Sequence, residues 1–181
     1  MRRTVLLAVV LLTGCAATAD PKPVSVPRAA EPQHAELGWR ESYPGTGERL
    51  RFAVDSLEVR TGGWSVEIAV TNDTRSSFEL GLHPARFSFG LMLFETGSLA
   101  ELDEANRAGG LPAVRLADTL KPAPPAVLAA GATWHATLTG RGSLADGSWV
   151  RVSFGPLVAI GEPPKDMQPV VYWITDRSHR L

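Results

Sequence analysis

The chain has a single cysteine, Cys15, and a thiol is the most chemically versatile side chain it contains. A cysteine can act as a nucleophile, bind a metal, form a disulfide or carry a lipid. Cys15 stands a short distance behind the apolar run Val5–Leu12. Because no cysteine follows it, the rest of the chain is expected to have no disulfide, thiolate metal site or cysteine nucleophile. The chemistry of the thiol therefore belongs to the N-terminal segment.

Residues 1–14 have the layout of a secretory signal peptide. Arg2 and Arg3 form a short basic region, and the apolar run behind them is well below the roughly 20 residues that span a bilayer. Two alternatives stay open. One is an ordinary signal cleaved at a small residue such as Ala17 or Ala19, and the other is a twin-arginine signal beginning at Arg2.

The apolar run ends in Leu12-Thr13-Gly14-Cys15, which resembles the lipobox of bacterial lipoproteins. The resemblance implies transfer of a diacylglyceryl group to the sulfur of Cys15, cleavage before Cys15 and acylation of the freed amine. It also implies a cell-envelope protein, anchored in membrane lipid through Cys15 and facing the periplasm or the exterior. Ala16 is not the aspartate that marks inner-membrane retention in enteric-type envelopes, so sorting to an outer membrane is compatible with the sequence.

Residues 15–36 are expected to be a tether. The segment has few bulky apolar residues, and its prolines favour extended conformers, so it cannot bury enough surface to offset the entropy of ordering. The prolines are Pro21, Pro23, Pro27 and Pro32. A folded domain is then expected over residues 37–181.

The charge balance argues against nucleic acid as a partner. The chain has 18 basic and 19 acidic residues, and removal of Arg2 and Arg3 leaves 16 against 19, a net charge of −3 with neutral histidines. No basic run and no basic-aromatic alternation is present.

Alternating apolar and polar residues predict short strands throughout the domain. The clearest case is residues 64–70, where one face carries Trp64, Val66, Ile68 and Val70 and the other carries Ser65, Glu67 and Ala69. Similar runs occupy residues 49–60, 86–94, 133–140, 148–158 and 170–176. Asn72-Asp73-Thr74 matches a glycosylation sequon but also suits a turn after a strand, and we favour the turn. The pattern predicts an antiparallel β-sandwich.

One segment predicts a short helix inserted between strands. Ser98 and Glu101 have capping-box spacing, and Gly109 follows as a stop. Leu99 and Leu102 are expected to pack over an open end of the sandwich.

Residues 128–155, LAAGATWHATLTGRGSLADGSWVRVSFG, resemble the region from strand E to strand F of immunoglobulin-like domains. Asp146, Gly147 and Trp149 would form the corner before strand F, with tryptophan at the usual tyrosine position. A more distant likeness is to the bacterial intracellular proteinase-inhibitor family. These resemblances imply an all-β, immunoglobulin-like sandwich and do not assign a function.

No recognisable catalytic motif stands in the sequence. The stretch GRGSLADG has neither a nucleophile elbow nor a phosphate-loop lysine, so it fits a hairpin turn. The four histidines are isolated along the chain, at His34, His83, His135 and His179. We therefore expect no enzyme activity, no cofactor and no metal site. The alternative is an extracytoplasmic hydrolase or metal-dependent enzyme whose site is assembled from residues distant in sequence.

The five tryptophans divide into two groups. Trp64 and Trp134 lie on apolar strand faces and are expected in the core. Trp39 and Trp173 lie near the ends of the domain among polar residues and are candidates for an exposed partner-binding surface. The sequence thus favours a membrane-anchored envelope lipoprotein that acts as a non-enzymatic binding or assembly module for a protein or glycan partner.

Overall fold

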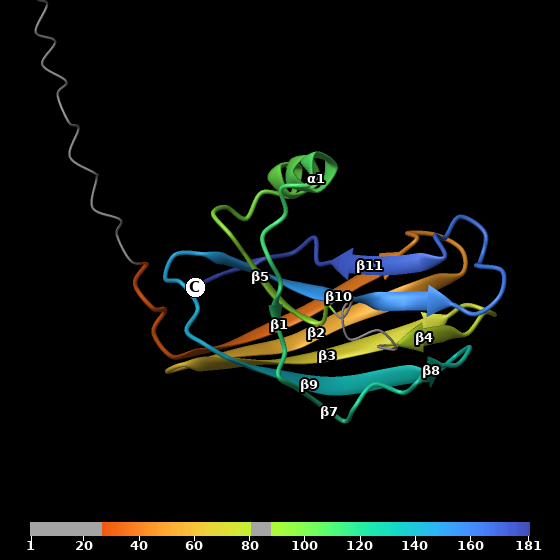
Figure 1. Ribbon diagram of the computed structural model, residues 1–181, viewed down its shortest axis with the longest axis horizontal. Coiled ribbons are helices and arrows are strands. Elements are labelled where there is room, and N and C mark those ends of the chain that lie inside the picture. The colour runs from red at the N-terminus through yellow and green to blue at the C-terminus, as the bar shows by residue number, and fades with distance from the viewer. Residues whose placement is uncertain (1–26, 81–87) are drawn as a thin grey trace, which may run out of the picture.

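The computed structural model describes residues 27–80 and 88–181, which form two antiparallel sheets packed against each other (Figure 1). The predicted all-β sandwich with one short helix is confirmed. The predicted signal peptide, Cys15 and residues 15–26 of the predicted tether lie outside the described residues, as does His83.

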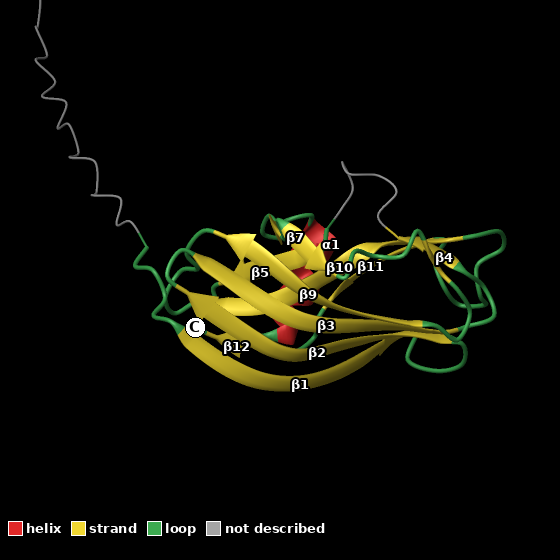
Figure 2. Cartoon of the chain, turned by 90° about the horizontal axis from the view of Figure 1, so that it is seen from below, coloured by secondary structure: helices red, strands yellow, loops and turns green. Residues whose placement is uncertain are grey.

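The first sheet, the five-stranded sheet, has four long strands and the short edge strand β7, in the order β1-β2-β3-β9-β7 (Figure 2). Its strands are β1 (Gln33–Tyr43), β2 (Arg49–Arg60), β3 (Gly63–Asp73), β7 (Thr119–Lys121) and β9 (Thr133–Arg141). Alternation of apolar and polar residues over β2, β3 and β9 accounts for their length, because one face of each strand can be buried along its whole run.

The second sheet, the seven-stranded sheet, is built around one long strand, β10 (Trp149–Ala159). Its other strands are β4 (Phe78–Leu80), β5 (Gly90–Phe94), β6 (Arg115–Leu116), β8 (Val127–Leu128), β11 (Val170–Ile174) and β12 (His179–Arg180). On one side β10 pairs with β5 and then β4, and on the other with β12 and then β11.

The strand order is that of immunoglobulin domains. The run β2-β3-β9-β7 corresponds to strands A, B, E and D, and β4/β5, β10 and β11/β12 correspond to strands C, F and G. β1 is an additional strand beyond strand A. The pairing of the strands therefore confirms the predicted antiparallel β-sandwich.

The folded part begins earlier than the predicted boundary at residue 37. β1 starts at Gln33, and Ala29 forms a bridge with Ala145. The backbone N–H of Ala30 donates to the Leu144 carbonyl at 2.8 Å. The prediction failed because this segment is held by backbone hydrogen bonds to a distant loop, which its composition does not reveal.

The predicted alternation in β3 is largely confirmed. Trp64, Val66, Ile68 and Val70 are all buried in the core between the sheets, and Glu67 is exposed on the other face. Ser65 and Ala69 are buried as well. Because β3 has β2 on one side and β9 on the other, side chains of these two strands cover its small outward side chains.

Asn72, the last residue but one of β3, has a fully buried side chain. Its amide nitrogen lies within hydrogen-bond distance of the carbonyls of Ser76, Leu128 and Ala129, and its side-chain oxygen accepts from the Thr74 N–H. The turn predicted for this segment is confirmed, and the amide is committed to holding it.

The helix α1 (Leu99–Ala108) has the predicted caps. The Ser98 hydroxyl accepts from the Glu101 N–H at 3.3 Å, and Gly109 ends the helix with a φ of 68°. Leu102 is buried, but Leu99 is 45% exposed. Figure 1 shows α1 above β5, along the side of the sandwich and not over one of its ends. The predicted packing of both leucines over an open end is therefore wrong.

The strands beside β10 are interrupted. The paired residues are Leu80 with Leu157, Gly90 with Ser153, Ile174 with Ser153, and His179 with Val150. Along the β11/β12 side, five residues correspond to three steps, which leaves a turn between β11 and β12.

A buried arginine holds that turn to the start of α1. Arg151, on β10, is fully buried. Its Nη1 donates to the carbonyls of Thr175, at 2.7 Å, and Asp176. Its Nη2 donates to those of Gly97, at 3.0 Å, and Ser98, at 3.3 Å. Burial lowers the pKa of Arg151, and the nearby charge of Asp176 opposes that shift.

The corner before β10 differs from the usual tyrosine corner. Gly147 has a φ of 75°, as a tight turn requires, and Trp149 then begins β10. A Cβ on Gly97 would lie 2.6 Å from the Trp149 ring. The tryptophan therefore packs against the segment that leads to α1.

Candidate functional site

The outer face of the five-stranded sheet has a hollow over its central strands. Arg40 pairs with Ala53, Ala53 with Ala69, and Ala69 with His135, so one row across β1, β2, β3 and β9 has two alanines in the middle and larger side chains at its ends. An alanine fills only a methyl group's space, and the missing volume leaves a hollow of about 470 Å³. We call this site the alanine hollow.

The next row supplies hydroxyl groups and a second arginine. Ser42 pairs with Arg51, Arg51 with Thr71, and Thr71 with Thr133. The hydroxyls of Thr71 and Thr133 lie 2.9 Å apart. These side chains and Arg49, which shares the outward face of β2, line the alanine hollow.

Two of the three arginines at the hollow have carboxylate partners. Arg40 lies 2.6 Å from Asp55, and Arg51 lies 2.6 Å from Asp73. Arg49 donates its Nε to the Gly47 carbonyl at 3.0 Å, and within residues 27–80 and 88–181 no carboxylate pairs with it. Because the paired arginines are more than half exposed, their ion pairs are weak and can exchange partners.

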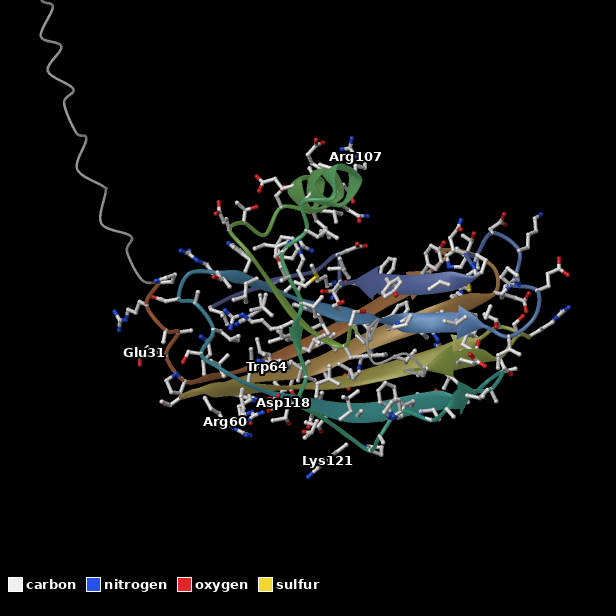
Figure 3. The ribbon with its side chains drawn as sticks, viewed as in Figure 1. Glu31, Arg60, Trp64, Arg107, Asp118 and Lys121 are labelled. Carbon is white, nitrogen blue, oxygen red and sulfur yellow. The ribbon has the colours of Figure 1, made fainter. Side chains whose placement is uncertain are left out.

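A second hollow of about 300 Å³ lies beside the first on the same sheet. Asp55 and His135 line both hollows, and Lys121 and Glu67 line the second. Figure 3 shows Lys121 at the flank opposite Arg107, which is on α1. The two hollows therefore adjoin each other at Asp55 and His135.

Trp39 does not lie at the surface. It is 7% exposed and belongs to the core between the sheets. Gly38, with a φ of 58°, stands at an irregularity in the pairing of β1 with β2, between Glu36 and Trp39. This irregularity turns Trp39 inward, so the prediction of an exposed Trp39 ring is wrong.

Trp173 is half-buried on β11. Its ring stacks on Phe52 at 5.5 Å, and its Nε1 donates to Glu41 at 2.8 Å. A hollow of about 160 Å³ lies beside it, lined also by Tyr43 and Tyr172. Among the described residues, ring contacts join Trp173 to Tyr43 and Phe52 and none joins it to Trp39, so the two candidates do not form one surface.

Glu41 connects the two sheets at their edges. It lies on β1 and accepts the Trp173 Nε1 together with the backbone N–H groups of Asp176 and Arg177, each at 3.0 Å. Burial and the charge of Glu41 raise the pKa of Asp176. The Trp173 region is thus fixed by structural hydrogen bonds.

The histidines stay apart in the described part of the chain. His34 lies 2.8 Å from Glu36, and His179 lies 3.3 Å from Gln33. His135 lines the alanine hollow. Within residues 27–80 and 88–181, no group of three or more histidine, cysteine, aspartate or glutamate side chains is placed to hold a metal ion.

The sequence did not point to the alanine hollow. Ala69 was expected on the outer face, but the outward alanines meet only in the register of β2 with β3. A small residue facing solvent is unremarkable in one strand, and it becomes a site only when its cross-strand neighbour is small as well. That pairing could be sought from the sequence once β2 and β3 are aligned as a hairpin.

Comparison of the chain with protein-family models, with curated proteins and with solved structures gives no match. No helix within the described residues has the length and apolar character needed to cross a membrane.

Proposed function

We propose that the chain is a cell-envelope lipoprotein, anchored in membrane lipid through Cys15, whose sandwich domain is a non-enzymatic binding module for an envelope protein or glycan. The anchor is supported by Leu12-Thr13-Gly14-Cys15 behind a basic and an apolar region. The twelve residues from Cys15 to the first described residue could span at most about 40 Å.

The observation that carries the binding role is the alanine hollow. Ala53 and Ala69 are cross-strand neighbours on β2 and β3, in the middle of the outer sheet face. A hollow of about 470 Å³ is within the usual size range of ligand sites, roughly 300–1,000 Å³. It is walled by guanidinium and hydroxyl groups that can bind a polar partner.

The anchor is tested by labelling with radioactive palmitate in the native cell. Cys15→Ser should accumulate as an unprocessed precursor and carry no label, because the acceptor sulfur is missing. Normal processing and labelling of this variant would rule out the lipid anchor.

The binding surface is tested by photo-crosslinking in intact cells. The crosslinker p-benzoylphenylalanine replaces Ser42 at the alanine hollow or, as a control, Arg107 on α1. We expect a discrete adduct from position 42 and none from position 107. An adduct from position 107 alone would move the partner to the helix flank, and no adduct from either position would contradict the binding role.

A further inference from the structure

We infer that the alanine hollow binds an acidic oligosaccharide, a chain of sugar rings that carry carboxylates. This inference rests on the proposed binding function and names the ligand class of the same site. Three features of the hollow support it. They are arginines that can take a new carboxylate partner, a mixture of hydrogen-bond donors and acceptors, and an apolar floor.

The arginines provide sites for carboxylates. Arg49 and Arg51 stand two residues apart on β2, so both face the hollow about 7 Å apart along the strand. A guanidinium binds a carboxylate through two parallel hydrogen bonds. Because no carboxylate within the described residues pairs with Arg49, it can take a ligand carboxylate without losing an ion pair.

The other polar groups indicate a ligand that also has hydroxyls. Ser42, Thr71 and Thr133 can donate or accept, and the Asp55 carboxylate can only accept. A ligand with anionic groups alone would be repelled by Asp55, and a cationic ligand would be repelled by Arg49. A carboxylated sugar satisfies both sets, because its hydroxyls donate to Asp55 and its carboxylate accepts from arginine.

The shape of the floor fits a chain of rings. Ala53 is partly exposed and, beside the buried Ala69, forms a shallow apolar floor against which the C–H face of a sugar ring can lie. The second hollow adjoins the first at Asp55 and His135 and is also lined by Lys121. Another ring of the same chain would continue along it.

Calorimetric titration of the full lipidated protein in non-ionic detergent tests the inference. The probe is tetragalacturonate, and its fully methyl-esterified form is the control, since it keeps the rings and removes the charges. We expect the acid to bind at least about tenfold more tightly than the ester, as charge-assisted hydrogen bonds require. Equal binding, or no binding of the acid, would overturn the inference.

Three variants locate the site. Arg49→Gln should weaken acid binding about tenfold, and Ala53→Val, which fills the floor, should weaken it by a similar factor. Arg180→Gln removes an exposed arginine of the other sheet and should leave the affinity unchanged within about twofold. Equal loss in Arg49→Gln and Arg180→Gln would mean diffuse attraction and would overturn the inference.

A competing acidic peptide separates the ligand class from charge alone. An oligoglutamate of four residues has the same number of side-chain carboxylates without sugar hydroxyls, and we expect it to compete at least about tenfold less well. If it competes equally, the hollow does not recognise a sugar. In that case a crosslink at position 42 would still support the proposed function, so the two failures are distinguishable.

Discussion

The outer faces of the two sheets carry different kinds of residues. On the five-stranded sheet, arginines form exposed ion pairs around two alanines, and four of the strands are nine or more residues long. On the seven-stranded sheet, the corresponding side chains of β10, Arg151 and Ser153, are buried, and the neighbouring strands are interrupted. The first face keeps its charged side chains in contact with solvent, and the second holds the chain's own segments.

The difference follows from the continuity of the strands. Continuous pairing places side chains in regular rows, so small residues on adjacent strands create a hollow with a defined lining. An interruption instead exposes backbone carbonyls, as in the turn between β11 and β12, and these need donors. Arg151 supplies donors to that turn and to the start of α1.

The largest expected effect is at Arg151. Arg151→Ala should lower the free energy of unfolding by about 3–5 kcal/mol, because it leaves buried carbonyls without donors and opens a cavity. Denaturant titration with a constant slope gives this value. Arg180→Ala, an exposed arginine on the same sheet, should change it by at most about 0.5 kcal/mol. Similar small losses in both variants would contradict the structural role of Arg151.

The five-stranded sheet is tested at two neighbours on β3. Ile68→Ala should destabilise the domain by about 2–5 kcal/mol through lost burial and a cavity. Glu67→Ala, on the outer face, should stay within about 0.5 kcal/mol. Equal losses in the same titration would mean that both faces of β3 are packed, and the contrast between the sheets would disappear.

The link between the sheets at Glu41 should have an intermediate effect. Glu41→Gln removes a charge that three donors share and should cost about 1–2 kcal/mol. The tryptophan fluorescence should shift as Trp173 loses its partner. Glu36→Gln, on the same strand, loses only an exposed contact with His34 and is the matched control. An unchanged spectrum and stability for Glu41→Gln would show that the edges are held by other contacts.

The smallest effect is expected at the surface pair of Asp118 and Arg141. The hydrogen bond from Arg141 lowers the pKa of Asp118, so the folded pKa lies below the unfolded one. The stability that this pair contributes is present above the unfolded pKa and is lost as the pH falls through the folded pKa. Asp118→Asn should therefore be slightly less stable than the parent at neutral pH and equal to it in acid. A difference that grows in acid would contradict the direction of this shift.

Much of the fold could be predicted because it rests on local patterns. The alternation of Trp64, Val66, Ile68 and Val70 predicts β3, and Ser98 with Gly109 predicts both ends of α1. These signals are complete within ten or so residues of chain.

Prediction from the sequence failed where segments distant along the chain determine whether a side chain is buried. Trp39 has polar neighbours in sequence, yet an irregularity in β1 turns it into the core. Arg151 alternates with apolar residues as an outward residue should, yet segments from residues 97–98 and 175–176 cover it. The alanine hollow depends on the register of four strands, which no single stretch of sequence contains.

The most direct test of the account compares the accessibility of the two regions in intact cells. Because the sulfur of Cys15 is expected to be a thioether, Thr133→Cys at the alanine hollow and Glu104→Cys on α1 would each carry one free thiol. The rate of maleimide labelling in cells is divided by the rate for the purified protein. The account predicts a ratio about tenfold lower for Thr133→Cys, since a bound partner covers most copies of the hollow. Equal ratios for the two thiols would contradict the claim that the open face of the five-stranded sheet is the binding surface.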